Sequence, residues 1–373
     1  MRSECAICNR NIKHIHSLEK MPIKLCCTDS PEINNAELSF SQCDECGTIQ
    51  LDKLIPLDIL YSNSHNYTSV GKVWENYFNL FCESINDLII DKNILEIGDP
   101  SGKIANRMDN YKKWHIIEPN KNKKIEFKEK IEFIESFFDE NFQTDKQIDM
   151  IVHSHLFEHI YDPNVFLKKC HEILVDDGEM FFGVPNMEYI GKNELAPFAG
   201  IFFEHTILLN KENITYLLNK NGFTILRIID YENHSILFHA KKSPTFLTDF
   251  ASSDNSIVNC ELFLSSVTNY KKFIEKCIRT IEENPNKKVY VFGASYNTQF
   301  LLSMGLNPEM ITGILDNSVD KQNKYLYGYN LKIYSPEIIR NKEDCIVILK
   351  NGYYNNEIMN QLLLLNDKIV IVK

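Results

Sequence analysis

Four cysteines near the amino terminus form two pairs with the same spacing. Cys5 and Cys8 make one Cys-x2-Cys unit, and Cys43 and Cys46 make a second unit after 34 intervening residues. This spacing lets paired thiolates reach one tetrahedral ion, and four thiolates would complete a Zn2+ site with no open coordination position. Free buried thiols or a redox pair are the alternative, but two such units favour a metal.

The same segment contains further residues of metal-binding type, namely Cys26, Cys27, His14 and His16. Adjacent cysteines cannot easily both face one ion, so we interpret these residues as packing residues. A segment this short buries too little apolar surface to fold by itself, and a metal would supply much of its folding free energy. We therefore expect a zinc-binding module at residues 1–60 with a structural role.

A glycine-containing turn further along the chain suits a ligand. The stretch 94–97 predicts a strand, and Gly98 and Gly102 follow it before a helix-compatible stretch at 103–108. Glycine lets a ligand approach the backbone closely, because a Cβ would occupy that space. The pattern predicts the first unit of a doubly wound sheet, although a plain strand-to-helix turn would look similar.

An acidic residue after the next predicted strand strengthens this interpretation. The strand 114–117 ends at Glu118, twenty residues beyond Gly98, where a carboxylate can accept hydrogen bonds from both hydroxyls of a ribose. A nicotinamide dinucleotide would be expected to use a GxGxxG loop for its pyrophosphate. S-adenosylmethionine has no phosphate, so the turn from Gly98 to Gly102 favours it as the cofactor.

Histidines occur at the end of the predicted buried strand 148–152. His153, His155 and His159 invite a metal or catalytic interpretation. A histidine at such a position is more often a satisfied wall residue. We therefore expect His153 to lie beside the cofactor and do not assign catalysis to any of the three.

A charged pair, Glu204 and His205, is framed by apolar residues. A neighbouring carboxylate can hold an imidazole in one tautomer and favour its protonated form, which is the combination required of a general base. The alternative is a surface pair at a helix start in which Glu204 only caps the helix. Both interpretations remain open from the residues alone.

The predicted elements divide the chain into more than one domain, because 373 residues are too many for one ordinary core. Towards the carboxy terminus, the strand 288–292 with Gly293 and the acidic strand end at Asp316 repeat the strand–helix–strand pattern. We expect an α/β protein with a zinc module, a central Rossmann-like domain and a second Rossmann-like domain. The expected boundaries are 1–60, 61–245 and 246–373.

Composition excludes some classes of partner. A formal net charge of -11 makes nucleic acid a poor partner, because the surface field repels polyanions. The sequence shows no secretory signal and no apolar run long enough to span a membrane, so a cytoplasmic location is expected. The oligomeric state is not predicted.

Several segments together resemble the class I S-adenosylmethionine-dependent methyltransferases. The segment 156–163, LFEHIYDP, is similar to the family's LEHI-x-DP, and Asp176-Asp177-Gly178 is similar to its DGG turn. The resemblance implies that certain residues surround the methionine portion, the ribose and the adenine of the cofactor. These residues are Glu96, Gly98 and Gly102 for the methionine portion, Glu118 for the ribose, and Ser136, Phe137 and Phe138 for the adenine.

The order of modules also resembles a narrower family, the bacterial C-methyltransferases that act on nucleotide-linked deoxy-ketosugars in carbohydrate biosynthesis. The resemblance implies that His205 removes the proton next to a ketone, with Glu204 as its partner and Tyr67 assisting. Tyr61 and Asn186 are the further expected substrate contacts. The chain has Phe202 and Phe203 where the family usually has tyrosine and histidine.

The resemblance further implies that the carboxy-terminal domain contacts the nucleotide of the sugar donor, with Asn297 and Asp316 as candidates. A folded domain whose loop binds nothing is the alternative. Three functions therefore stay open: methyl transfer to carbon of a nucleotide-linked ketosugar, transfer to oxygen or nitrogen of a sugar or related metabolite, and a zinc-containing binding protein without activity.

Overall fold

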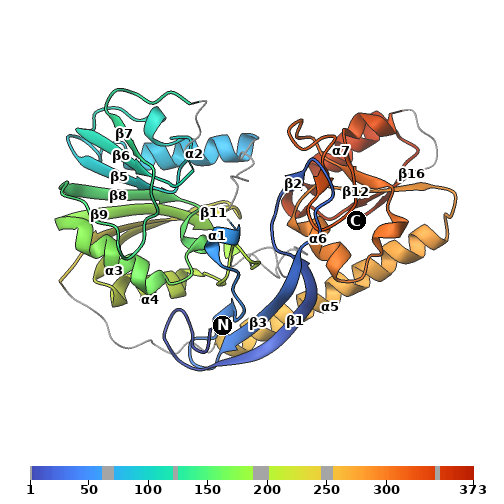
Figure 1. Ribbon diagram of the computed structural model, residues 1–373, viewed down its shortest axis with the longest axis horizontal. Coiled ribbons are helices and arrows are strands. Elements are labelled where there is room, and N and C mark those ends of the chain that lie inside the picture. The colour runs from blue at the N-terminus through green and yellow to red at the C-terminus, as the bar shows by residue number, and fades with distance from the viewer. Residues whose placement is uncertain (1, 61–70, 121–124, 188–200, 245–254, 341–344) are drawn as a thin grey trace.

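The computed structural model describes residues 2–60, 71–120, 125–187, 201–244, 255–340 and 345–373. In Figure 1 two α/β domains lie side by side and are joined along one side by amino-terminal strands and a long helix. Among the described residues, no helix is long and apolar enough to cross a membrane. The predicted boundaries near residues 60 and 245 adjoin segments outside the described residues, so they stay predictions.

The amino-terminal segment forms an antiparallel sheet with strand order β1-β3-β4. A separate short strand, β2, pairs with β14 of the carboxy-terminal domain, with Cys27 opposite Leu326. The elements are β1 (Ile12–Pro22), β2 (Cys27–Thr28), β3 (Asn35–Cys43), β4 (Ile49–Leu51) and α1 (Leu57–Leu60).

The central domain is built on a seven-stranded sheet with the order β10-β11-β9-β8-β5-β6-β7. The run from β7 to β9 is parallel, and β11 is antiparallel to both neighbours. The strands are β5 (Asn93–Ile97), β6 (Lys113–Ile117), β7 (Ile131–Ile134), β8 (Ile148–Ser154), β9 (Leu174–Pro185), β10 (Phe223–Tyr231) and β11 (Ser235–Lys242). The expected doubly wound central domain is confirmed.

Helices cover both faces of this sheet: α2 (Lys72–Ile85) lies on one face, and α3 (Pro163–Ile173) and α4 (Lys211–Lys220) lie on the other (Figure 1). Alternation along β5 explains this, because Ile94 packs with the α2 side and Leu95 with the α3 side. Helix α3 begins where Asp162 accepts a hydrogen bond from the Val165 amide at 3.0 Å.

The carboxy-terminal domain has a five-stranded sheet with the order β15-β13-β12-β16-β17, and all of its strand pairs are parallel. The expected second Rossmann-like unit is therefore present. Its elements are α5 (Asn255–Glu282), β12 (Lys288–Phe292), α6 (Tyr296–Ser303), β13 (Gly313–Leu315), β14 (Tyr325–Leu326), β15 (Ile333–Tyr334), β16 (Cys345–Leu349), α7 (Asn355–Leu365) and β17 (Val370–Val372).

The amino-terminal segment divides its apolar residues between two cores. Leu38 and Phe40 belong to a core shared with α5 and the carboxy-terminal sheet, and the Phe40 ring lies 5.0 Å from that of Phe263. Cys5 and Ile7 belong to a core shared with α3 and α4. Burial against both domains therefore adds to any folding free energy that a metal supplies.

Candidate functional site

The carboxyl ends of the parallel strands define the candidate cofactor edge of the central sheet. The chain passes from β5 to β6 on one side and later returns to β8 on the other side of β5. Ligands of open α/β sheets bind in the crevice at this reversal of strand order. Gly98, Glu118 and Phe137 follow β5, β6 and β7 respectively, so the structure brings these predicted residues to one edge.

The glycine turn requires glycine for two reasons. Gly98 and Gly102 have φ of 83° and 61°, in the left-handed region that favours glycine. A Cβ on Gly98 would lie 2.9 Å from Leu156 Cδ1, and a Cβ on Gly102 would lie 2.7 Å from Phe127 Cε1. Protein packing as well as ligand approach therefore explains these glycines.

Glu96 belongs to β5, two residues before Gly98. Its side chain is 1% exposed, and it accepts a hydrogen bond from Trp114 Nε1 at 2.8 Å. Burial raises the pKa of Glu96 well above its ordinary value, with Asp99 as the next cause. The predicted contact of Glu96 with the methionine portion stays a prediction, and in the structure its carboxyl group binds Trp114.

Glu118 occupies the predicted position of the ribose acceptor. It is 9% exposed, and its Oε1 accepts a hydrogen bond from the Asn120 amide at 2.9 Å. Burial raises its pKa. Beyond β7, Phe137 is 53% exposed, whereas Phe138 packs against Phe142 and Phe166. Of these two phenylalanines, Phe137 therefore has the more exposed ring.

His153 lies inside the core between β8, β9 and α3. Its side chain is fully buried, its ring stacks on Phe182 with centroids 4.6 Å apart, and neither ring nitrogen has a hydrogen-bond partner among the described residues. Burial lowers the pKa of His153 to about 3. This matches a wall residue, and the ring has no exposed surface to offer a cofactor in this structure.

His205 meets a second histidine. His205 Nε2 lies 3.2 Å from His159 Nε2, and both residues follow a glutamate, Glu204 and Glu158. Burial lowers the pKa of His205 well below its ordinary value, and His159 and His155 lower it further. The predicted effect of a carboxylate, to favour the protonated form of His205, is therefore outweighed by burial, and the structure favours the neutral form.

The other charged groups of this cluster lie at the end of β8. Glu158 is 1% exposed, and its Oε1 lies 3.4 Å from His155 Nδ1. His155 has φ of 49°, an uncommon value for a non-glycine residue that often marks a functional bend. Glu158 and His159 are functional candidates that the sequence analysis did not select. The sequence signal that could identify them is a second Glu-His dipeptide, at Glu158-His159, besides the one at Glu204-His205.

The segment that carries His205 is held by a tight turn and by the amino-terminal sheet. Phe202 and His205 exchange backbone hydrogen bonds of 3.0 and 2.9 Å. The next residue, Thr206, accepts a hydrogen bond from the Leu51 amide at 2.8 Å, and Arg2 donates to Thr206 Oγ1 at 3.1 Å. The position of His205 therefore depends on residues near the cysteine pairs.

Aromatic residues of α2 line the neighbouring space. The Trp74 ring lies 4.8 Å from that of His155 and 4.5 Å from that of His234, and Tyr77 shares a 2.8 Å hydrogen bond with Ser154. Asn186, a predicted substrate contact, donates a hydrogen bond from its backbone N–H to the His234 carbonyl oxygen at 2.9 Å. Two other predicted residues, Tyr61 and Tyr67, lie outside the described residues.

The four predicted cysteine ligands converge. The Sγ atoms of Cys5 and Cys46 are 3.5 Å apart, as are those of Cys8 and Cys43, and all four lie within 4.8 Å of one another. Tetrahedral Zn2+ with bonds of about 2.3 Å would place its sulfurs about 3.8 Å apart. The donor set and spacing fit Zn2+. The additional candidates of this segment (Cys26, Cys27, His14 and His16) do not join the cluster.

In the carboxy-terminal domain, Asp316 joins two loops at the carboxyl edge of the sheet. Its Oδ2 accepts a hydrogen bond from the Ala294 amide at 2.8 Å, and its Oδ1 accepts one from Ser318 at 2.9 Å. Asn297 lies in the first turn of α6. Beside it, Tyr296 stacks on Phe202 at 5.5 Å, so this loop adjoins the turn that carries His205.

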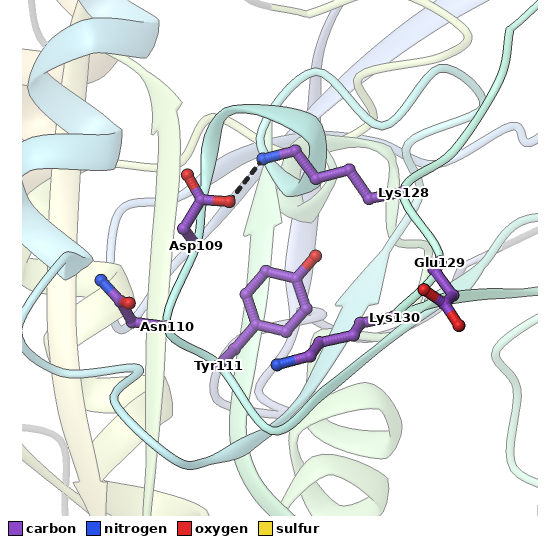
Figure 2. A pocket seen from close by; sticks show the side chains of 6 residues that line it. All are labelled: Asp109, Asn110, Tyr111, Lys128, Glu129 and Lys130. Carbon is purple, nitrogen blue, oxygen red and sulfur yellow. Dashed lines mark hydrogen bonds and ion pairs between the residues drawn. The ribbon is translucent and has the colours of Figure 1, made fainter.

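A separate pocket of about 230 Å³ lies at the other end of the strands, where β6 and β7 begin. Figure 2 shows the side chains that line it. Residues 109–111 and 128–130 line it, and they precede β6 and β7. Lys128 Nζ is paired with Asp109 Oδ1 at 2.8 Å. Because it lies at the amino ends of these strands, this pocket is remote from the reversal of strand order.

Comparisons with known proteins agree with this architecture. A methyltransferase-domain family model matches residues 73–228, and a model described as the C-methyltransferase C-terminal domain matches residues 255–369. No curated protein matches the chain in sequence.

Solved structures of methyltransferases resemble part of the chain. The N-methyltransferase NodS from Bradyrhizobium japonicum WM9 shares 13% identity, with a TM-score of 0.36 and coverage of 46% of this chain and 97% of that chain. The magnesium protoporphyrin IX methyltransferase ChlM from Synechocystis PCC 6803 shares 9%, with a TM-score of 0.37 and coverage of 46% and 84%. With a methyltransferase domain followed by a C-methyltransferase C-terminal domain, the protein is an enzyme of the methyltransferase class.

Proposed function

We propose that the enzyme transfers a methyl group from S-adenosylmethionine to a carbon atom next to the ketone of a nucleotide-linked sugar, with His205 as the general base. The observation that carries this proposal is the position of His205. It lies beside a buried carboxylate, Glu158, and next to the loop of the second α/β domain that begins α6. A carbon acceptor is also supported by the description of the family model that matches residues 255–369.

The cofactor would lie at the carboxyl edge of β5 and β6. Glu118 would accept hydrogen bonds from the ribose, the exposed ring of Phe137 would lie near the adenine, and the turn from Gly98 to Gly102 would adjoin the methionine portion. S-adenosylmethionine would supply the methyl group as an electrophile on its sulfonium. The other chemical requirement, a nucleophilic carbon, falls to the protein.

The environment of His205 suits proton removal from carbon. Since burial keeps its pKa low, the imidazole is neutral near pH 7 and its lone pair can accept a proton. The imidazolium formed in this way would lie close to the Glu158 carboxylate, whose negative charge would stabilise it. Glu204, 6% exposed, stays the predicted partner of His205. Tyr67 stays a residue that is predicted to assist proton removal.

The nucleotide portion of the substrate would contact the loops at Asn297 and Asp316. The first of these loops adjoins the turn that carries His205, through the contact of Tyr296 with Phe202. Asp316 already binds the Ala294 amide, so its role would be to shape the loop as well as to contact the ligand. Tyr61 and Asn186 stay the further predicted contacts of the sugar. We also propose that the cysteine cluster holds structural Zn2+, which the sulfur spacing supports.

A substrate panel tests the proposal. The zinc-loaded enzyme would be incubated with methyl-labelled S-adenosylmethionine and with nucleotide sugars that carry either a ketone or only hydroxyl groups, and products would be identified by mass spectrometry. Methylation at carbon, only in the ketone-containing sugars, is expected. Methylation of a hydroxyl or an amine would refute the carbon route, and no product with any member would refute the substrate class.

A further inference from the structure

A second group of metal-binding side chains lies within the proposed active site. Glu158, His159 and His205 each offer one ligand atom, and these atoms lie within 4.8 Å of one another. Two of the residues come from the segment after β8, and His205 comes from the turn that begins at Phe202. The tertiary fold, and not a local sequence spacing, therefore assembles this group.

The distance between the two imidazoles fits a shared ion. Metal–nitrogen bonds of about 2.0–2.1 Å, at angles between those of octahedral and tetrahedral geometry, place two nitrogens about 3.0–3.4 Å apart. His159 Nε2 and His205 Nε2 are 3.2 Å apart. A direct hydrogen bond between neutral rings has a similar length, so this distance alone does not decide between the two arrangements.

The environment of Glu158 favours a bound cation over a direct hydrogen bond between the two imidazole rings. Its side chain is 1% exposed, and Oε2 is buried with no hydrogen bond among the described residues. A buried carboxylate needs a positive partner or a full set of donors, because its desolvation is costly. In the part of the chain that the structure describes, the Glu158 carboxylate faces His155 Nδ1, which lies 3.4 Å from Oε1. A metal ion between the carboxylate and the two Nε2 atoms would compensate the charge.

We propose that Glu158, His159 and His205 bind one divalent transition-metal ion, and that this ion occupies the Nε2 lone pair with which His205 would accept a proton. Two imidazoles and a carboxylate favour Zn2+, Co2+ or Ni2+ over Mg2+ and Ca2+. Three protein ligands leave a coordination position open, so this ion exchanges more readily than the ion of the closed cysteine site.

The second half of the proposal rests on the proposed function. If His205 is the base, metal and proton compete for the same nitrogen, and the bound ion holds the enzyme inactive. Removal of the ion restores the free imidazole. Transition-metal ions should therefore inhibit methyl transfer, and a chelator too weak to strip the four-thiolate site should reverse the inhibition.

Co2+ titration tests the site without reference to activity. Full-length protein with Zn2+ already in the cysteine cluster would be titrated with Co2+ and followed by visible absorption. One equivalent should bind with the d–d bands of nitrogen and oxygen ligation and without a thiolate charge-transfer band. His159→Gln and His205→Gln should each weaken binding by about 100-fold or more. His171→Gln, on α3 and outside the group, should leave it unchanged.

Two outcomes would overturn the inference: no binding beyond the cysteine site, or binding that both glutamine variants retain. Circular dichroism of the variants checks that they fold. Acceleration of methyl transfer by Co2+ would contradict competition between the metal ion and the proton for His205.

The outcomes also separate the metal site from the proposed function. If Co2+ does not bind but His205→Gln still abolishes transfer, the metal inference fails and the proposed function stands. If Co2+ binds as expected but His205→Gln retains full activity, the proposed function fails and the metal site stands.

Discussion

The cysteine cluster and the Glu158–His159–His205 group are both sets of metal-binding side chains, but they are built in different ways. The cysteines come as two local pairs, and their four thiolates leave no open coordination position. The second group joins residues 46 positions apart and offers three ligands of mixed type. The first arrangement suits a structural ion, and the second suits chemistry or an exchangeable ion.

The two sites are also connected. Thr206, next to His205, is hydrogen-bonded to Leu51 of β4 and to Arg2. Cys43 ends β3, and Cys46 lies in the connection from β3 to β4. A structural ion in the first site would therefore help to fix the base in the second. Substitutions in each site should consequently differ in whether they change stability, activity or both.

The largest effect on stability is expected for Cys43→Ser. Loss of one thiolate should remove Zn2+ and lower the free energy of unfolding by more than about 4 kcal/mol, because metal loss is among the most destabilising changes. Zinc content and denaturant unfolding would be measured, with Cys26→Ser as the matched control outside the cluster. Unchanged zinc content in Cys43→Ser would contradict a four-thiolate site.

The largest effect on activity at constant stability is expected for His205→Gln. Loss of a general base should lower kcat by about 10²- to 10⁴-fold, while the thermal midpoint changes little because His205 as a whole residue is half-buried and glutamine keeps a polar side chain there. His171→Gln would serve as the control. A kcat within a factor of about 3 of the wild type would exclude His205 as the base.

A smaller, combined effect is expected for Arg2→Met, which tests the connection between the sites. The substitution removes the donors to Thr206, Leu51 and Tyr161, and should cost about 1–3 kcal/mol. Methyl transfer should slow even at temperatures where the variant is folded. Lys20→Met, at an exposed position of β1, is the control. Full activity in the folded Arg2 variant would show that the link is not needed to place His205.

The effect that is smallest near pH 7 concerns the pH dependence of stability. The pKa of His153 is about 3 in the folded protein, below the ordinary value of 6.5, so protons bind the unfolded state preferentially between these values. The stability contribution of neutral His153 is therefore complete above pH 6.5 and falls by about 1.4 kcal/mol per unit as the pH drops towards 3. His153→Phe should flatten the pH dependence of the free energy of unfolding between pH 6.5 and 5. An identical pH dependence in both proteins would be inconsistent with burial of a neutral ring.

Local patterns made much of the fold predictable. The central sheet, the second α/β domain and the cysteine cluster follow from strand periodicity, the turn at Gly98 and the Cys-x2-Cys spacing, all of which act over short distances in the chain. The contact between His159 and His205 depends on how a turn at 202–205 approaches the end of β8. Periodicity does not encode that approach, so the sequence alone predicts only a wall residue at His159.

Residues 1–60 have too little apolar surface of their own to form a core, as their composition predicts. Contacts outside the segment supply the rest. In the structure Phe40 packs against Phe263 of α5, and Ile7 packs within the core of α3 and α4. Interdomain packing of this kind depends on partners more than a hundred residues away, which a reading of local composition does not reveal.

The central claim is that His205 removes a proton from carbon, and hydrogen exchange tests it most directly. The enzyme with S-adenosylhomocysteine, which cannot donate a methyl group, would be mixed with a ketone-containing nucleotide sugar in D2O and followed by NMR. The account predicts enzyme-dependent incorporation of one deuterium next to the ketone, and its loss in His205→Gln. Exchange at the same rate in both proteins, or methylation of that sugar at oxygen without any exchange, would contradict it.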